Sequence, residues 1–434
     1  MHNSIDDQTK KASIITLSII VLSIFLNQQK PMFGYNLSFS DFAAILLILI
    51  FVFKKKLVIP NSIMLFFLLL SVITVSSAYF ISPNKFNYMV NIDLIINNYL
   101  KLVSSFIYFI LGYNFYKNMK MDLVYKWYSI GAVIVGLMGV LIVFFNINII
   151  NNEYLFMGSR YIGLMSDPNY FSVIQCTALV FFMRKKDLSK TFRVLCCIVI
   201  FLSIALAGSK TGMIVLICYT LIVLGETILI NRTRQQLLKN LFIVLVIIIL
   251  LPFLFNLFNA TINAIASVYP TFDRVKILFV DFGSAISDGG SSRDRTWSVA
   301  IDIVKESPIF GVGIGSYLAV TNAVHGGGGF AHNTYLQIMA EWGMPLSSTL
   351  FIFMFYIIFK HVASNRKMRS ESIIIRDIFI ILLIGSLALS LNNARMFWLF
   401  LGALYKSSQY LKIGLNRYSH KETYRNLNTN NYYS

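Results

Sequence analysis

The chain has 434 residues, of which 57% are hydrophobic and only 13% are charged, and its mean hydropathy is +0.69. This composition excludes a soluble globular domain and predicts a single integral membrane domain over residues 1–434. The formal net charge of +18 would fit a nucleic-acid partner, but no basic patch interleaved with aromatic residues occurs, so we predict no nucleic-acid binding.

Apolar segments long enough to cross a bilayer recur along the whole chain. We predict twelve membrane-spanning segments, at residues 12–27, 37–53, 61–80, 99–116, 127–146, 168–184, 194–208, 211–230, 240–258, 335–359, 377–393 and 396–412. They lack the alternation of a barrel strand, and backbone amides in hydrocarbon must pair within their own segment, so each segment is expected to be an α-helix. The predicted fold class is therefore all-α, a polytopic membrane helical bundle.

The first apolar segment follows Lys10 and Lys11, as the core of a signal peptide would. No small-residue cleavage pattern follows Asn27 and further spans come directly after it, so we expect an uncleaved first helix. Cytoplasmic connections of membrane proteins carry an excess of Lys and Arg. With the N-terminus inside, the inner segments hold 26 of the 37 Lys and Arg residues. This bias predicts cytoplasmic termini, a cytoplasmic tail at residues 413–434 and a large external loop at residues 259–334.

Three cations run against this bias, because they lie near the outer ends of predicted spans. They are Arg160 in Gly-Ser-Arg, Lys210 in Gly-Ser-Lys-Thr-Gly and Arg395 in Asn-Asn-Ala-Arg. A lipid diphosphate in the outer leaflet would account for them, and ordinary headgroup anchoring is the alternative. Between the first two, Asp167 and Pro168 open the sixth span as a helix N-cap followed by proline at the first helical position.

A helix is predicted inside the external loop, over Ser292–Glu306, with one apolar face formed by Trp297, Ala300, Ile301 and Val304. Arg293 and Arg295 stand at its N-terminal end, where the helix dipole is positive. Free N-terminal amides together with guanidinium groups suit a phosphate. The alternative is that Asp288 and Asp294 neutralise the two arginines. Because the loop as a whole is not basic, we expect a local anion site.

His332 lies near the outer end of the predicted span 335–359, and histidine is the side chain best able to exchange a proton near neutral pH. An interfacial histidine without a catalytic role is the alternative. Asn333 either orients a sugar hydroxyl or caps the span, and Glu341 is expected to pair with another helix. No two aspartates are spaced two apart, as in many metal-dependent glycosyltransferases, so we predict neither a metal nor a cofactor.

Several segments, taken in this order, resemble the O-antigen ligase and polymerase superfamily, membrane glycosyltransferases that handle polyprenyl-diphosphate-linked glycans. The segments are Gly158-Ser159-Arg160, Asp167-Pro168-Asn169, Gly208-Ser209-Lys210-Thr211-Gly212, Ser292-Arg293 with Trp297, Pro308-Ile309-Phe310-Gly311-Val312-Gly313, and His332-Asn333-Thr334-Tyr335-Leu336-Gln337 followed by Glu341-Trp342-Gly343. The resemblance covers residues 158–343. The first five spans match only in hydropathy.

The resemblance implies a GT-C-like bundle of about twelve helices, with one large external loop that contains short helices and covers the active site. It implies that loop arginines and the histidine matter, which makes His332 and Arg293 the expected catalytic residues. The residues expected to bind substrate are Arg160, Lys210, Arg295, Asn333, Tyr335 and Arg395. Position 210 departs from the superfamily, which usually has arginine there, and lysine offers a point charge instead of a fork.

The predicted function is that of a polysaccharide polymerase in the plasma (inner) membrane, metal-independent and inverting, with its active site facing outward. The expected partners are an undecaprenyl-diphosphate-linked oligosaccharide, membrane lipids and a chain-length regulator protein. Two alternatives stay open. One is an O-antigen ligase that transfers glycan to a lipid or protein acceptor, and the other is a lipid-linked glycan flippase or another secondary transporter.

Overall fold

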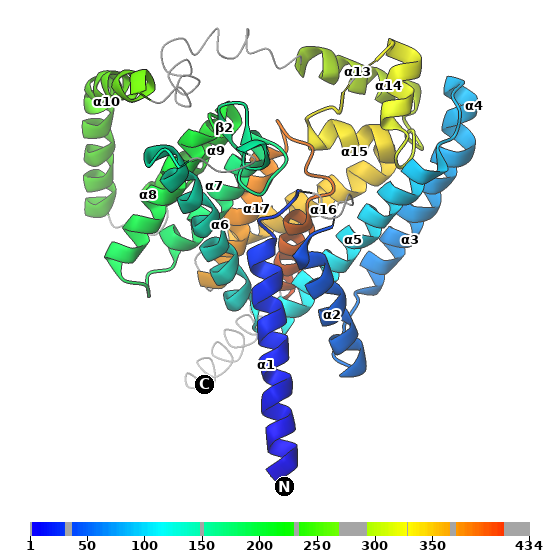
Figure 1. Cartoon of the computed structure of the whole chain (residues 1–434), viewed down its shortest axis with the longest axis horizontal. Helices are drawn as coiled ribbons and strands as arrows, with labels where there is room; N and C mark the ends of the chain where they lie inside the picture. The colour runs from blue at the N-terminus through cyan, green and yellow to red at the C-terminus, as the bar shows by residue number, and fades with distance from the viewer. Residues whose placement is uncertain are drawn as a thin grey trace, which may run out of the picture.

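The computed structural model describes residues 2–30, 37–147, 152–229, 234–268, 293–327, 329–364 and 370–411, and most of them are helical (Figure 1). The helices are α1 (His2–Phe25), α2 (Phe39–Phe53), α3 (Asn61–Ser76), α4 (Ser82–Phe86), α5 (Ile92–Lys117), α6 (Met121–Phe144), α7 (Pro168–Arg184), α8 (Lys190–Leu206), α9 (Lys210–Leu229), α10 (Arg234–Val268), α13 (Arg293–Glu306), α14 (Tyr317–His325), α15 (Thr334–Trp342), α16 (Met344–Ala363) and α17 (Ser370–Gly385). A last helix covers residues 395–411. Shorter elements are the π-helical η1 (Ser77–Ile81), the 3-10 turn η2 (Asn152–Tyr154) and the paired strands β1 (Phe156–Met157) and β2 (Arg160–Tyr161).

Within the described residues, four helical segments are long and apolar enough to cross a membrane: Asn61–Phe86, Ile92–Lys117, Met121–Phe144 and Met344–Ala363. Shorter apolar helices run over Ile14–Phe25 and Phe39–Phe53. Large apolar side chains stay exposed on α3, where Leu65, Leu68 and Val72 have no protein cover, as a lipid-facing surface requires. The predicted all-α membrane protein is confirmed, and the number of twelve spans stays a prediction.

The hairpin of β1 and β2 lies at the same end of the bundle as α13 and α14, and α1 begins at the opposite end (Figure 1). We call the first of these the hairpin end. The core between the two ends is built around α7, which packs against α6, α8, α9 and α17 and is buried along almost its whole length. The long α1 packs along α2 and α6 at the side of this core.

Polar side chains cap α7 and α9, whose first turns lie near the hairpin end. Asp167 caps α7, with Oδ1 accepting from the backbone N–H groups of Asn169 and Tyr170 at 2.8 and 3.0 Å, and Pro168 follows at the first helical position. The predicted cap is therefore confirmed. Ser209 caps α9 in the same way, because its Oγ accepts from the backbone N–H of Gly212 at 3.0 Å. Caps of this kind fix where each helix starts.

Two glycines let the last helix cross α5 in backbone contact. A methyl group on Gly112 of α5 would overlap the carbonyl oxygen of Leu399, and one on Gly402 would overlap the carbonyl oxygen of Phe109. Small residues allow this approach between helices in a membrane, where close packing takes the place of the hydrophobic effect. The crossing therefore leaves no room for a side chain on either helix.

We expect Gly112→Ala to lower the free energy of unfolding by about 1–3 kcal/mol, because overpacking against a backbone carbonyl forces the two helices apart. The midpoint of thermal unfolding of the solubilised protein measures this loss. Gly225→Ala in α9 is the matched control, since a methyl group there would meet no atom of the described structure within 4 Å. Equal midpoints for the two variants would show that α5 and the last helix do not touch at Gly112.

A buried ion cluster joins α7, α9 and α17, and we call it the Asp377 cluster. Asp377 is fully buried and accepts hydrogen bonds from Arg184 Nε at 2.7 Å, Arg376 Nε at 2.8 Å and Tyr219 Oη at 3.0 Å. Glu226 pairs with both arginines, at 2.9 Å from Arg184 Nη2 and 2.6 Å from Arg376 Nη2. Two cations and two anions thus balance each other inside the bundle, which is the condition for burying charge.

The predicted span 335–359 is wrong as a single helix, because Gly343 breaks it into α15 and α16. Gly343 has a φ of 77°, and a side chain there would overlap the carbonyl oxygen of Ile309. The backbone N–H groups of Val312 and Gly313 donate to the carbonyls of Ala340 and Glu341, at 2.8 and 3.0 Å. The glycine-rich turn thus satisfies the carbonyls that end α15. The Glu341 carboxylate accepts from Gln337 in its own helix and lies within electrostatic range of Lys101 on α5.

The loop helix predicted to end at Glu306 is confirmed as α13, but its predicted apolar face is only partly right. The buried residues are Thr296, Val299, Ala300 and Ile303. Ile301 is 41% exposed instead, because α13 packs against α15 in a small core that includes Val312, Ala331 and Ala340. Ser292, Asp288 and the predicted tail 413–434 lie outside the described residues.

Candidate functional site

The first turns of α7, α9 and α13 meet the β1–β2 hairpin at the hairpin end. Polar side chains from these four elements form one group, which we call the arginine cluster: Arg160, Asp167, Asn169, Ser209, Lys210, Thr211 and Arg293. The sequence predicted that three of its members, Arg160, Lys210 and Arg293, act on the same substrate group. The fold gathers their segments into one place.

Arg160 is fixed by three segments of the chain. Gly158, with a φ of 60°, makes the hairpin turn that leads into Arg160. The half-buried Arg160 guanidinium donates from Nε to the carbonyl of Ala207 at 2.9 Å and from Nη2 to Asn169 Oδ1 at 3.2 Å. Asn169 Oδ1 also accepts from Ser209 Oγ at 2.9 Å. The guanidinium is thus held over the end of α8 and the beginnings of α7 and α9.

Arg293 reaches the same place from the first turn of α13. Its Nη2 donates to Thr211 Oγ1 at 3.2 Å, and the other guanidinium nitrogens have no hydrogen-bond partner among the described residues. Partial burial lowers the pKa of Arg293, and nearby Asp167 opposes that change. Asp294 is exposed and forms no ion pair with Arg293 in the described structure, so it does not neutralise this arginine. Arg293 thus keeps donors for a further anion.

The arginine cluster combines two sources of positive potential. Arg160, Lys210 and Arg293 supply three positive charges, which exceed the single negative charge of Asp167, the cap of α7. The N-termini of α7 and α9 add the positive ends of two helix dipoles. Among the described residues, no group of three or more His, Cys, Asp or Glu side chains is placed to hold a metal ion. An anion with several oxygens, such as a phosphate ester, fits these donors.

His332 lies apart from the arginine cluster, directly before the cap of α15. It is exposed, its φ is 47°, and its ring makes no hydrogen bond within the described part of the chain. Left-handed backbone is uncommon outside glycine, and histidine is one of the residues enriched there. The preceding Ala331 packs into the small core under α13, so His332 stands beside that helix. No hydrogen bond in the described structure joins the histidine to Arg293.

Two residues expected to bind substrate are engaged in the fold. Asn333 is the N-cap of α15, and its Oδ1 accepts from the backbone N–H groups of Tyr335 and Leu336 at 3.0 and 3.2 Å. Tyr335 donates from its hydroxyl to the carbonyl of Leu383 at 3.0 Å and packs its ring 5.3 Å from that of Phe351. Of the two roles considered for Asn333, the structure shows the cap. Tyr335 faces the bundle, not an open surface.

Two predicted cations also lie away from the arginine cluster. Arg295 is exposed and follows Arg293 by two residues, which turns it about 200° around α13. Arg395 forms a bidentate pair with Asp41, at 2.7 Å from Nε to Oδ1 and 2.6 Å from Nη2 to Oδ2. Asp41 also accepts from Tyr108 Oη and from the backbone N–H of Ser38. Arg395 therefore ties the last helix to α2 and α5.

Sequence reasoning gave no role to Asn169 and Thr211, although both stand in segments that it singled out. Asn169 joins Arg160 to Ser209, and Thr211 accepts from Arg293. The sequence could have indicated both residues, because each is polar, lies in the first turn of an apolar helix and is close to a predicted outward cation. The fold adds the information that these first turns face one another.

A search of curated proteins found no match to this chain. Residues 195–353, which run from α8 into α16, match the family described as O-antigen ligase. This region holds Lys210, Thr211, Arg293 and His332, so the cluster and the histidine fall largely inside the matched segment. This match confirms the resemblance to the O-antigen ligase and polymerase superfamily that the sequence motifs indicated.

Proposed function

We propose that this protein is a polysaccharide polymerase of the plasma membrane. It transfers a glycan from an undecaprenyl-diphosphate-linked donor to a sugar hydroxyl of a lipid-linked repeat unit. The arginine cluster carries the proposal, because the half-buried Arg160 and Arg293 face the capped N-termini of α7 and α9. The superfamily match over residues 195–353 supports the same class of reaction.

In this reaction the bond between the anomeric carbon and the diphosphate breaks while the acceptor oxygen attacks from the opposite face. The new glycosidic bond therefore has inverted configuration. Arg293, with Arg160 and Lys210, stabilises the negative charge that develops on the leaving diphosphate, the role that a metal ion fills in other transferases. His332 orients the acceptor hydroxyl and takes its proton. Its exposed ring, without a hydrogen-bond partner in the described structure, is accessible to that hydroxyl.

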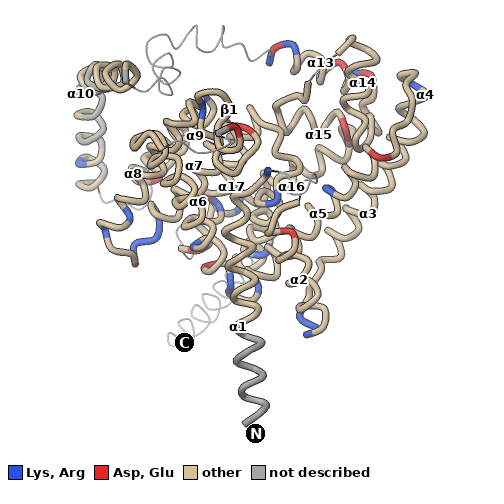
Figure 2. Tube along the Cα trace, viewed as in Figure 1, with Lys and Arg blue, Asp and Glu red and all other residues tan. Residues whose placement is uncertain are grey.

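The proposed membrane arrangement has twelve GT-C-like spans, cytoplasmic termini and an outward hairpin end. Figure 2 supports this orientation, since Lys and Arg gather where α2 ends and where α7 leads into α8, away from the hairpin end. These are the connections that hold Lys54, Lys55 and Lys56, and residues 184–193. By the positive-inside rule, that end faces the cytoplasm. Donor lipid in the outer leaflet then meets the arginine cluster from the outside.

Purified protein in lipid nanodiscs tests the proposed reaction when it is given only the undecaprenyl-diphosphate-linked repeat unit. A polymerase produces a ladder of multiples of the repeat, because each lipid-linked unit serves as donor and acceptor. A ligase, the activity that the matched family description names, makes no product until a separate lipid or protein acceptor is added. Movement of the lipid across the membrane without a new glycosidic bond would contradict both and indicate a transporter.

We expect His332→Asn to reduce ladder formation about 100-fold, since a positioned general base contributes that much or more. Asparagine tolerates the left-handed backbone at this position, so the change removes the imidazole without adding strain. The initial rate of repeat addition in nanodiscs measures the effect. His325→Asn, at the end of α14, is the matched control and should keep the wild-type rate. A wild-type rate for His332→Asn would show that His332 does not act as the general base.

A further inference from the structure

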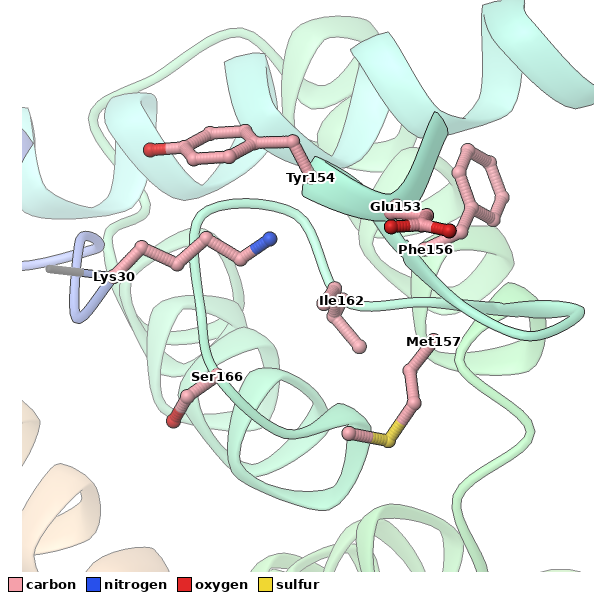
Figure 3. Close-up of a pocket in the computed structure, with 7 residues that line it drawn as sticks. All are labelled: Lys30, Glu153, Tyr154, Phe156, Met157, Ile162 and Ser166. Atoms are coloured by element: carbon pink, nitrogen blue, oxygen red, sulfur yellow. The ribbon is translucent and has the colours of Figure 1, made fainter. Parts of the chain in front are cut away.

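A second recess opens beside the arginine cluster, at the β1–β2 hairpin. It is a pocket of about 560 Å³ between the residues after α1, the segment from η2 to β1, and the loop that leads into α7 (Figure 3). Tyr154, Phe156, Met157 and Ile162 give it apolar walls, and Lys30, Glu153 and Ser166 are the polar residues at its edge. Pockets of this volume hold small organic ligands.

Lys30 is the unusual residue of this pocket. The residue is only 8% exposed, and its side chain extends into the recess toward Tyr154, with Nζ 4.1 Å from the centre of that ring (Figure 3). Among the described residues the ammonium has no hydrogen-bond acceptor and no carboxylate partner, although Glu153 lines the same pocket. Burial lowers the pKa of Lys30. Apart from the face of the Tyr154 ring, the ammonium has no partner among the described residues, so its N–H donors can bind oxygen atoms of a ligand in the pocket.

The pocket and the arginine cluster share the hairpin and the start of α7. Met157 in the pocket stands opposite Arg160 in the register of the two strands. Ser166 at the pocket edge directly precedes Asp167, the cap of α7. A ligand that places its diphosphate at the arginine cluster therefore has the pocket next to it. In an undecaprenyl-diphosphate-linked glycan, a sugar is attached directly to the diphosphate.

We propose that this pocket is a glycan subsite, in which Lys30 donates hydrogen bonds to oxygen atoms of a sugar residue of the repeat unit. The proposal rests on the proposed function for the identity of the ligand. A sugar has apolar ring faces and a rim of oxygens, and the pocket offers apolar walls with a donor at Lys30, an acceptor at Glu153 and a hydroxyl at Ser166. A free fatty chain would offer the Lys30 ammonium no acceptor.

The test compares three compounds on wild-type protein and on Lys30→Met, which keeps the unbranched stem and loses the ammonium. The compounds are undecaprenyl diphosphate, the undecaprenyl-diphosphate-linked repeat unit and the lipid-free repeat oligosaccharide. We expect Lys30→Met to weaken binding of the linked repeat unit about tenfold, as loss of a hydrogen bond from a charged donor does, with no change for undecaprenyl diphosphate. If Lys30→Met weakens binding of the lipid-free oligosaccharide equally, the pocket binds a sugar of the acceptor. If it weakens binding of the linked repeat unit alone, the pocket binds a sugar of the donor.

The controls separate this subsite from the proposed reaction. Lys305→Met removes an exposed lysine whose ion-pair partner in the described structure is Asp302, and it should leave every affinity unchanged. Met157→Trp narrows the pocket from its half-exposed rim without altering Lys30, and it should weaken glycan binding as well. Wild-type affinity of Lys30→Met for all three compounds would overturn the subsite. Failure of the wild-type protein to bind either lipid would instead overturn the proposed function, while the lipid-free oligosaccharide still tests the pocket.

Discussion

Replacing Arg293 by alanine is expected to slow glycan polymerisation about 1,000-fold. The guanidinium stands at the beginnings of α9 and α13, bound to Thr211 and otherwise without a hydrogen-bond partner in the described structure. Removing one preorganised donor from a developing anion typically costs a factor of 100 to 1,000, and this donor carries a full charge in a partly desolvated place. The rate of ladder growth in nanodiscs and glycan chain length in cells measure the loss.

Arg295→Ala is the matched control, because the same residue type is removed from the same helix but from its exposed side. It should keep nearly the wild-type rate. Arg293→Lys should recover only part of the activity, since lysine provides a point charge where arginine provides a planar fork. Equal rates for Arg293→Ala and Arg295→Ala, at equal amounts of protein in the membrane, would exclude the arginine cluster from catalysis.

Asp377→Asn is expected to lower the free energy of unfolding by about 3–5 kcal/mol, the usual cost of breaking a buried ion pair from one side. Asparagine would leave Arg184 and Arg376 to share the single charge of Glu226 in a place where the Asp377 side chain is fully buried. The asparagine N–H groups would also face two guanidinium groups, which cannot accept hydrogen bonds. The fall in the midpoint of thermal unfolding of the solubilised protein measures the effect.

Asp302→Asn supplies the comparison, because Asp302 also pairs with a cation but does so on the surface of α13. An exposed pair of this kind contributes less than about 1 kcal/mol, so the midpoint should stay close to that of the wild type. If the two aspartate variants unfold at the same temperature, the Asp377 cluster does not hold α7, α9 and α17 together.

Local patterns in the sequence were sufficient to predict where several helices of the bundle begin and end. The predicted segment 168–184 coincides with α7, because an aspartate cap followed by proline and an unbroken apolar run fixes both ends of a helix locally. The end of α13 at Glu306 was predicted for the same reason, with Pro308 just beyond it. These features depend on neighbours along the chain, which a single sequence displays.

Features that depend on distant partners were not predictable in this way. The outward position of Arg395 suggested a diphosphate ligand, but its partner Asp41 lies 354 residues away, and no local pattern indicates that pairing. The break at Gly343 was missed because the apolar run continues through it. The glycine-rich turn that satisfies the carbonyls of α15 comes from residues 311–313. Glycine in an apolar run is compatible with a continuous membrane helix, so hydropathy alone does not reveal the break.

For the candidate site, the sequence singled out segments that the fold brings together, but it did not predict how each side chain is placed. Arg160 and Arg293 bind neighbouring helix starts, at Asn169 of α7 and Thr211 of α9. Arg295 points away from Arg293 around α13, because residues two apart on a helix point in nearly opposite directions. Asn333 was expected either to orient a sugar hydroxyl or to cap the helix. Its hydrogen bonds from the backbone of Tyr335 and Leu336 show that it is the cap.

The position of the last helix has a consequence for how the protein is made. Residues 395–411 provide the backbone that meets Gly112 and the guanidinium that pairs with Asp41, so two early helices receive their neighbour only from the C-terminal end of the chain. During synthesis α2 and α5 are complete long before residues 395–411 are made, so until then Asp41 lacks the positive charge of Arg395. A chain that ends before residue 395 therefore lacks both the backbone that packs against Gly112 and the guanidinium that pairs with Asp41.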